Sequence, residues 1–260
     1  MKKENLRSIL GIPYFLFLLI FVVCPVLILV YYAFTNGAGE LSFENFILFF
    51  SDSKAIGTLI YSGMIAITTT IVCLLLAYPV AYILAKGEFK RGNVLLMLFV
   101  MPMWINFTLR ITALKEILTM IERNLAFHPF LNTVIGMTYD FLPFMILPIY
   151  NTIAKIDHSY IEAARDLGAK SYKVFVRVIL PLSVPGIISG VTMVLLPSMT
   201  NYVVLDMMYN STYIMGSLVG SYFNMYDWNN GSVISMILLI LIFILSIITG
   251  EFTEKEDSYE

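Results

Sequence analysis

The dominant pattern in the chain is a series of long apolar stretches separated by short polar segments. Five stretches contain no Asp, Glu, Lys or Arg, and a sixth is interrupted only by Asp140; together they cover residues 9–34, 55–85, 92–109, 131–154, 178–205 and 228–250. A helix of ~20 apolar residues crosses a bilayer core of ~30 Å. We therefore predict an all-α integral membrane protein that forms one domain over residues 1–260, with six transmembrane helices at about residues 9–34, 57–85, 93–113, 131–154, 178–204 and 230–250.

Proline recurs inside these stretches or at their edges, at Pro13, Pro25, Pro79, Pro102, Pro143, Pro148, Pro181, Pro185 and Pro197. Each proline removes a backbone donor, which membrane helices tolerate where a neighbouring helix or water satisfies the freed carbonyl. We therefore expect broken or kinked helices. Gly186 and Gly190 form a pair of small residues four apart that would let another helix approach closely, although this spacing also arises by chance in apolar helices.

The distribution of Lys and Arg predicts the orientation in the membrane. With six spans and the N-terminus inside, twelve of the 16 basic residues are cytoplasmic: Lys2, Lys3, Arg7, Lys86, Lys90, Arg91, Lys155, Arg165, Lys170, Lys173, Arg177 and Lys255. The external side holds the other four, Lys54, Arg110, Lys115 and Arg123. We therefore expect both termini to be cytoplasmic, and the segment from about Pro197 to Asn230, which has no Lys or Arg, to be an external loop.

Composition and motifs exclude several classes of function. The near-neutral net charge of -2 argues against a nucleic-acid partner. Cys24 and Cys73 lie inside apolar stretches, which favours buried, inert thiols over a disulfide or a metal site. The segment Gly87–Val94 has the glycine spacing of a Walker A motif but lacks its Lys and Ser/Thr, and neither H-E-x-x-H nor G-x-S-x-G occurs. We expect no catalytic residue, no metal and no cofactor in this chain.

A charged segment before the fifth stretch predicts a short amphipathic helix. Ser159 and Glu162 match an S-x-x-E capping box, so we expect the helix to begin at Ser159. Gly168 stands where a helix C-cap requires a positive φ, and Ser171 can begin the next helix. The apolar residues follow helical spacing on one narrow face, at Tyr160, Ala163, Ala164 and Leu167. Such a helix either docks into a groove of another protein or rests on lipid headgroups.

The same segment resembles the inner-membrane permeases of ATP-binding-cassette importers. Their last cytoplasmic loop carries E-A-A-x-x-x-G, followed after nine residues by I-x-L-P, which match Glu162, Ala163, Ala164, Gly168, Leu180 and Pro181 here; Val178 replaces the usual isoleucine. The resemblance implies a coupling helix, at about residues 159–168, that docks onto a cytoplasmic ATPase and transmits its nucleotide-driven closure. It further implies the fold of these permeases, an ATPase dimer, a second permease subunit, an extracytoplasmic substrate-binding protein and a location in the bacterial inner membrane.

Other stretches are similar to the spermidine/putrescine permeases, in particular to the PotB type, whose second permease partner would be PotC-like. The similarity rests on "MPMWINFTLRITALKEIL" (101–118), "LPFMILPIYNTIAKID" (142–157), "VLLPSMTNYVVLDMM" (194–208) and "DW" (227–228). Permeases for other solutes share parts of these stretches, so a different small solute is the alternative cargo. Asp140 stands where a charged residue is not typical of the family.

A polyamine path needs carboxylates, carbonyl groups or aromatic faces along its route. The candidates are Trp104, Asn106, Asp140, Tyr202 and Asp206. Each has a simpler interpretation: Asp140 can bond a neighbouring helix, Trp104 can belong to the core or the interface belt, and Asp206 can be a solvated acid. Arg110 either snorkels to the outer surface or pairs with an acid. An ion-coupled secondary transporter that uses Asp140 is the rival hypothesis, but such a carrier has no need of a coupling loop.

Overall fold

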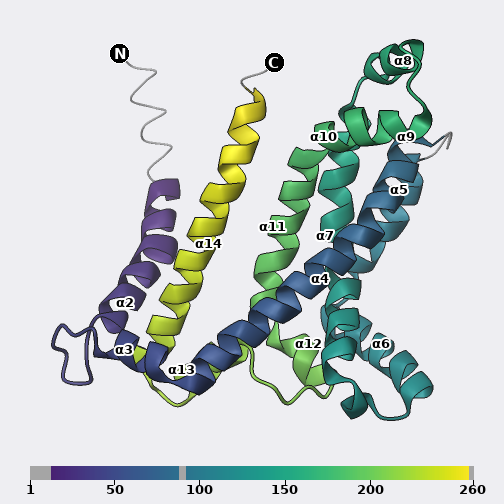
Figure 1. The fold of residues 1–260 in the computed structure, drawn as a ribbon. Coiled ribbons are helices and arrows are strands. Elements are labelled where there is room, and N and C mark those ends of the chain that lie inside the picture. Colours follow the sequence, from purple (N-terminus) through teal and green to yellow (C-terminus); the bar gives the residue numbers. More distant parts are fainter. Residues whose placement is uncertain (1–12, 88–91, 258–260) are drawn as a thin grey trace, which may run out of the picture. The chain divides into compact units, whose positions relative to one another are not determined.

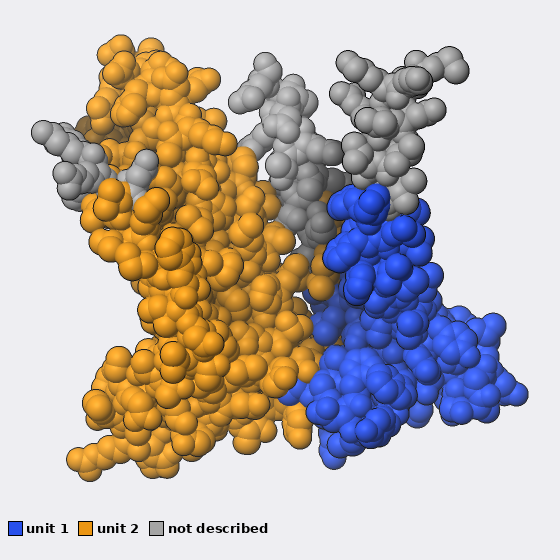
Figure 2. Space-filling model, turned by 180° about the vertical axis from the view of Figure 1, so that it is seen from behind, with its two compact units in different colours: residues 1–58, 217–241 blue, residues 59–216, 242–260 orange. Residues whose placement is uncertain are grey.

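The computed structural model describes residues 13–87 and 92–257, and its described residues fall into two compact units. Unit 1 comprises residues 1–58 and 217–241, and unit 2 comprises residues 59–216 and 242–260 (Figure 2). The described residues are helical apart from turns and one isolated β-bridge, between Thr35 and Leu41. The predicted all-α class is therefore confirmed. Lys2, Lys3, Arg7, Lys90 and Arg91, on which the predicted orientation partly depends, lie outside the described residues.

Unit 1 begins with the apolar helical segment Pro13–Ala33, which contains the π-helical turn η1 (Leu19–Val23) and α2 (Cys24–Ala33). Helix α3 (Glu44–Ser51) follows, then the start of α4 (Ser53–Lys86), most of α13 (Met215–Asn224) and the first half of α14 (Trp228–Asp257). The start of α14 is fixed to the end of the first helical segment. Asn229 donates to the carbonyl oxygen of Thr35, and the rings of Trp228 and Tyr32 lie 6.3 Å apart.

Unit 2 is built around α7 (Pro129–Lys155), the most buried of the long apolar helices (Figure 1). Its other elements are most of α4, α5 (Gly92–Val100), η2 (Met101–Trp104), α6 (Phe107–Glu122), η3 (Leu125–Phe127), α8 (His158–Asp166), α9 (Ser171–Val174), η4 (Phe175–Ile179), α10 (Leu180–Leu182), α11 (Val184–Thr200) and α12 (Tyr202–Met207). Within this unit, α8 lies at one end of α7, and α6 and α12 lie at the other (Figure 1).

Helix α11 packs closely along α7, and two glycines make this possible. A Cβ atom on Gly186 would lie 2.8 Å from the carbonyl oxygen of Pro148 and 2.6 Å from Oγ1 of Thr152. A Cβ atom on Gly190 would lie 2.6 Å from Sδ of Met145. The spacing of Gly186 and Gly190 therefore marks a real helix contact, which brings backbones together and increases dispersion contacts.

Three helical segments are long and apolar enough to cross a membrane: Pro13–Ala33, Ser53–Lys86 and Pro129–Lys155. Two further candidates are bent pairs, Val94–Trp104 with Phe107–Glu122 at 98° and Ser171–Leu182 with Val184–Thr200 at 60°. A single straight helix over 93–113 or over 178–204 is therefore not formed. The breaks occur beside Pro102 and Pro181, as the proline pattern predicts.

The segment from Pro197 to Asn230 is more regular than the predicted external loop. Helix α11 continues to Thr200, and α12 and α13 follow. A Cβ atom on Gly216, near the start of α13, would lie 2.0 Å from the carbonyl oxygen of Thr200, so the chain folds back tightly here. The prediction of a loop here rested on the absence of Lys and Arg, and charge distribution does not indicate where helices form.

Replacing Gly186 by Ala should destabilise unit 2. The new methyl group meets backbone at Pro148, which cannot move as a flexible side chain can, and overpacking of this kind costs roughly 1–3 kcal/mol. We expect a lower midpoint in thermal unfolding of the purified protein in detergent. Gly63→Ala is the matched control, because a Cβ there meets nothing within 4 Å. Equal midpoints for the two variants would contradict the close contact.

Candidate functional site

Helix α8 and the turn that follows it form the candidate site, and the N-terminus of α8 is capped by an aspartate. Oδ1 of Asp157 accepts a hydrogen bond from the backbone N–H of Ser159 at 2.9 Å. This bond lowers the pKa of the Asp157 carboxyl, because it favours the charged form. The predicted capping box of Ser159 and Glu162 is therefore wrong: the helix begins at His158, and Asp157 satisfies the free backbone donor of Ser159.

The C-terminus of α8 ends as the sequence predicts. Gly168 has a φ of +77°, the left-handed conformation that glycine adopts without strain. The N–H of Ala169 donates to the carbonyl of Ala164 at 3.0 Å, and the N–H of Gly168 donates to the carbonyl of Arg165 at 2.8 Å. These two bonds form a Schellman motif, which fixes the direction in which the chain leaves the helix.

Three of the four residues of the apolar face predicted for α8 are exposed. Tyr160 is 59% exposed and Leu167 is 88% exposed, and Ala163 is exposed as well. The helix is instead anchored by Ile161, which is buried in a small cluster with Ile156, Val174 and Ile179. Sequence reasoning missed Ile161, although an isoleucine three residues before Ala164 was the available signal. Ala164 packs partly against the same cluster, so Tyr160, Ala163 and Leu167 are the part of the predicted face that is free to contact something outside this chain.

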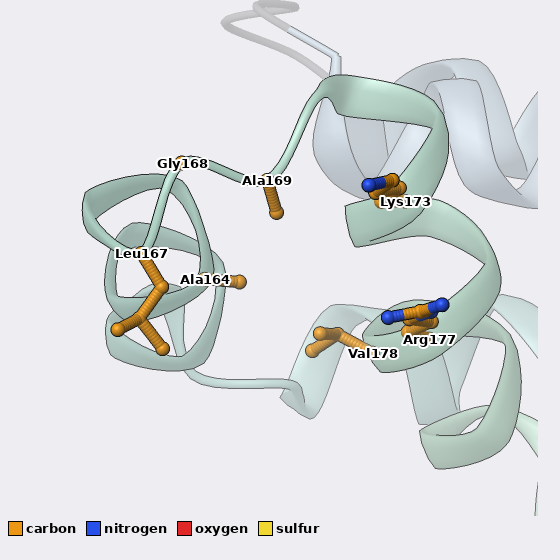
Figure 3. A pocket seen from close by; sticks show the side chains of 7 residues that line it. All are labelled: Ala164, Leu167, Gly168, Ala169, Lys173, Arg177 and Val178. Carbon is orange, nitrogen blue, oxygen red and sulfur yellow. The ribbon is translucent and has the colours of Figure 1, made fainter.

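A notch of about 280 Å³ opens beside the end of α8. Figure 3 shows the side chains that line it, with α8 and its turn on one side and α9 and η4 on the other. The lining residues are Ala164, Leu167, Gly168, Ala169, Lys173, Arg177 and Val178. Three of these, Ala164, Gly168 and Val178, belong to the matched motif, so the notch is part of the same site.

The segment that carries the second half of the motif is tied to α4. Leu180 is half-buried and Pro181 exposed in α10, directly before the bend into α11. At that bend the buried hydroxyl of Ser183 lies 2.9 Å from the hydroxyl of Tyr78. At the other end of the loop, Nζ of Lys86 donates to the carbonyl of Ile156 at 2.6 Å. Both ends of the α8 loop are therefore fixed to the same helix.

Asp140 is buried and forms an ion pair with Arg110. Nη2 of Arg110 donates to Oδ1 of Asp140 at 2.7 Å, and both side chains are at least nine-tenths buried. Nε and Nη1 of Arg110 have no partner among the described protein atoms. The expectations that Asp140 faces the interior and that Arg110 pairs with an acid are confirmed. The pair joins α6 to α7 beyond the break in the third apolar stretch.

The remaining path candidates lie on three elements. Trp104 is 86% exposed at the end of η2, and Asn106 caps α6 by accepting from the N–H groups of Thr108 and Leu109. Tyr202 and Asp206 are both exposed and lie one turn apart on α12, which packs against α6 and α7. Asn106 thus has a structural role, and Asp206 is a solvent-accessible acid.

An ammonium group already rests on an aromatic ring in this region. Nζ of Lys115, on α6, lies 4.1 Å from the ring centroid of Tyr209, just after α12. A cation and an aromatic face attract each other through the ring quadrupole. Tyr209 is exposed and escaped the sequence analysis, since nothing in its neighbourhood along the chain signals a role.

Comparisons with known proteins agree with the site. The sequence profile of the family described as binding-protein-dependent transport system inner membrane component matches residues 77–252. The chain is 36% identical over 256 residues to the spermidine/putrescine transport system permease protein PotB of Haemophilus influenzae, covering 89% of this chain and 88% of that protein. It is 37% identical over 199 residues to PotB of Escherichia coli K12, covering 70% of this chain and 72% of that protein.

Solved structures show the same fold at low sequence identity. The chain matches a bacterial ABC transporter involved in the import of alginate with a TM-score of 0.72 and 15% identity, covering 98% of this chain and 96% of that one. It matches the inward-facing MetNI methionine ABC transporter with a TM-score of 0.60 and 15% identity, covering 78% of this chain and 98% of that one. At these identities the likeness establishes the architecture alone.

Removing the charge of Asp140 should destabilise the protein through Arg110. In Asp140→Asn the guanidinium stays buried without its anion, and breaking a buried pair on one side costs roughly 3–5 kcal/mol. The double variant Asp140→Asn/Arg110→Gln removes both charges, so we expect it to unfold at a higher temperature than the single variant. Thermal unfolding of the wild type, both single variants and the double variant measures this coupling. Strictly additive effects would show that the two residues do not interact.

Proposed function

Because the chain belongs to the family of binding-protein-dependent transport system inner membrane components, we propose that it is the transmembrane permease subunit of an ATP-binding-cassette importer for spermidine and putrescine. The observation that carries the proposal is α8: a capped helix on which the matched residues Glu162 and Ala163 are exposed, on a loop fixed at both ends. The similarity to PotB proteins over most of the chain supports the cargo. The chain itself is non-catalytic, and hydrolysis takes place on a separate ATPase chain.

The exposed face of α8 is the surface on which we place that ATPase. A cytoplasmic ATPase dimer would hold the helix at Tyr160, Ala163 and Leu167 and move it when nucleotide binds. Ile161 and the hydrogen bonds at Ser183 and Ile156 make the loop move with the bundle rather than independently. A second, PotC-like permease subunit and an extracytoplasmic binding protein complete the proposed assembly. The alginate importer, solved in complex with its ligand-bound periplasmic protein, supports this arrangement.

We extend the proposal to six membrane spans in one permease domain, with both termini cytoplasmic in the bacterial inner membrane. The three long apolar helices supply three spans, and the two bent pairs supply the third and fifth. The sixth is α14, whose apolar part is Trp228–Ile244. Broken helices suit a transporter, because irregular backbone at membrane depth is tolerated where it lines a cavity or packs against protein.

For the cargo path we propose an entry region at α12, with Tyr202 and Asp206 as its exposed cation-attracting residues. The ion pair with Arg110 supports a structural role for Asp140. For Asp140 to contact the cargo, an ammonium group of the polyamine would have to replace the guanidinium of Arg110. The ammonium of Lys115 on Tyr209 supports the chemistry, since a polyamine ammonium can use the same ring. Trp104 offers a second exposed aromatic face; Asn106 contributes by holding the start of α6.

Replacing Gly168 by Val tests the coupling role of α8. A β-branched residue at positive φ is strained by roughly 1–3 kcal/mol, whereas Asn adopts this conformation more readily. Nothing lies within 4 Å of a Cβ there, so the strain comes from the backbone alone. We expect Gly168→Val to lose substrate-stimulated ATP hydrolysis and spermidine uptake in the assembled transporter, and Gly168→Asn to retain most of both. Normal coupling in Gly168→Val, with both variants inserted in the membrane, would refute docking at α8.

Neutralising Asp206 tests the cargo. In Asp206→Asn the side chain keeps its size and loses its attraction for a cation, so we expect the KM for radiolabelled spermidine to rise several-fold in cells that express the whole transporter. The difference should shrink at high ionic strength, because salt screens exposed charges. Glu40→Gln, an exposed acid in unit 1, is the control. If the wild type imports no polyamine but another solute, the cargo is wrong while the permease assignment stands.

A further inference from the structure

Two basic side chains face the notch beside α8 without an acidic partner. Lys173 and Arg177 lie one above the other on the side of α9 and η4 that faces α8 (Figure 3). Both are exposed, and within the described part of the chain neither has a carboxylate within 4.0 Å. Like charges one helical turn apart repel each other, so the fold maintains this pair at a small cost. An anion between them would remove that cost.

The opposite wall of the notch leaves room for such an anion. It consists of Ala164, Gly168 and Ala169, whose small side chains leave the space open, and the Schellman bonds hold them in place. The volume of about 280 Å³ exceeds that of a single carboxylate, so an acidic side chain can enter from outside. A guanidinium binds a carboxylate through two parallel hydrogen bonds, and a lysine adds a further donor. The notch is therefore built for an Asp or Glu side chain.

The notch and the exposed face of α8 are continuous. Leu167 and Ala164 line the notch and belong to the same helix as Tyr160 and Ala163, which the proposed ATPase would cover. A protein that grips α8 therefore also reaches Lys173 and Arg177. We infer that the notch receives an acidic side chain of the partner ATPase, next to the cleft that holds α8. This inference rests on the proposed function, because it assumes that an ATPase binds there.

Zero-length cross-linking tests the contact directly. A water-soluble carbodiimide activates a carboxylate, and the amine of Lys173 then displaces the activating group to form an amide bond. In the purified whole transporter, mass spectrometry should find Lys173 joined to an Asp or Glu of the ATPase. Lys170 is the internal control, since it is exposed on the same loop but does not line the notch. The inference is wrong if the ATPase is bound while Lys170 is joined to it and Lys173 is not.

The affinity of the ATPase for the permease tests the role of Arg177, which cross-linking does not report. We expect Lys173→Gln/Arg177→Gln to weaken binding of the ATPase to the permease in nanodiscs about tenfold, as loss of charge-assisted hydrogen bonds predicts. The control Lys155→Gln/Lys170→Gln removes the same amount of charge from exposed residues outside the notch and outside α8. The loss should be the same in phosphatidylcholine nanodiscs with and without phosphatidylglycerol. A loss that occurs only with phosphatidylglycerol would identify a lipid headgroup as the occupant and overturn the inference.

The two proposals fail in different ways. The docking role of α8 is wrong if the wild-type permease does not bind the ATPase. It is also wrong if the Gly168→Val permease binds the ATPase as well as the wild type does and remains fully coupled. If the ATPase binds, Gly168→Val uncouples it, and the double variant of the notch binds like the wild type, the docking role stands and the notch contact is wrong.

Discussion

The close contact between α11 and α7 is the interaction on which the rest of unit 2 depends. These helices precede and follow the α8 loop, and Gly186 lets their backbones meet near the ends from which that loop departs. Because membrane helices gain no hydrophobic driving force from one another, this close fit provides their dispersion contacts. The α8 loop therefore begins and ends at two helices that pack against each other. In the proposed docking at α8, a displacement of this loop would act on both helices together.

The breaks in the helices are possible because each has a specific polar partner. At the bend before α11, Ser183 bonds the carbonyl of Leu180 and meets the hydroxyl of Tyr78. At the 98° turn after Trp104, the side chain of Asn106 satisfies the first free donors of α6. Proline removes a donor and limits where the helix can continue. Asn106 then caps the new helix α6, whereas Ser183 bonds back to the helix that ends before the bend. The bent geometry therefore follows from pairs of residues rather than from proline alone.

Sequence patterning predicted the helical class, the proline breaks, the positive φ of Gly168 and the contact at Gly186, because each depends on local chemistry or helical spacing. It failed at the start of α8, where Asp157 rather than Ser159 is the N-cap, because neighbouring residues of both types are good N-caps. Helices α12 and α13 were also missed, since helices this short show too few turns for their spacing to be recognised. The partner of Asp140 could not be predicted from the sequence, because the pairing with Arg110 joins residues 30 positions apart.

Charge placement in unit 2 separates structural ions from accessible ones. Arg110 and Asp140 neutralise each other where water is excluded, and removal of either would leave an ion with no favourable solvation. Lys173, Arg177 and Asp206 remain exposed, at the two opposite ends of α7. Exposed charges contribute little to stability, so these three side chains are available for contacts with other molecules. The basic pair lies beside the helix proposed to bind the ATPase, and the acid lies on the helix proposed to meet a cationic cargo. The helices of unit 2 lie between these two ends, and among the described residues the buried pair of Arg110 and Asp140 adds no net charge to them.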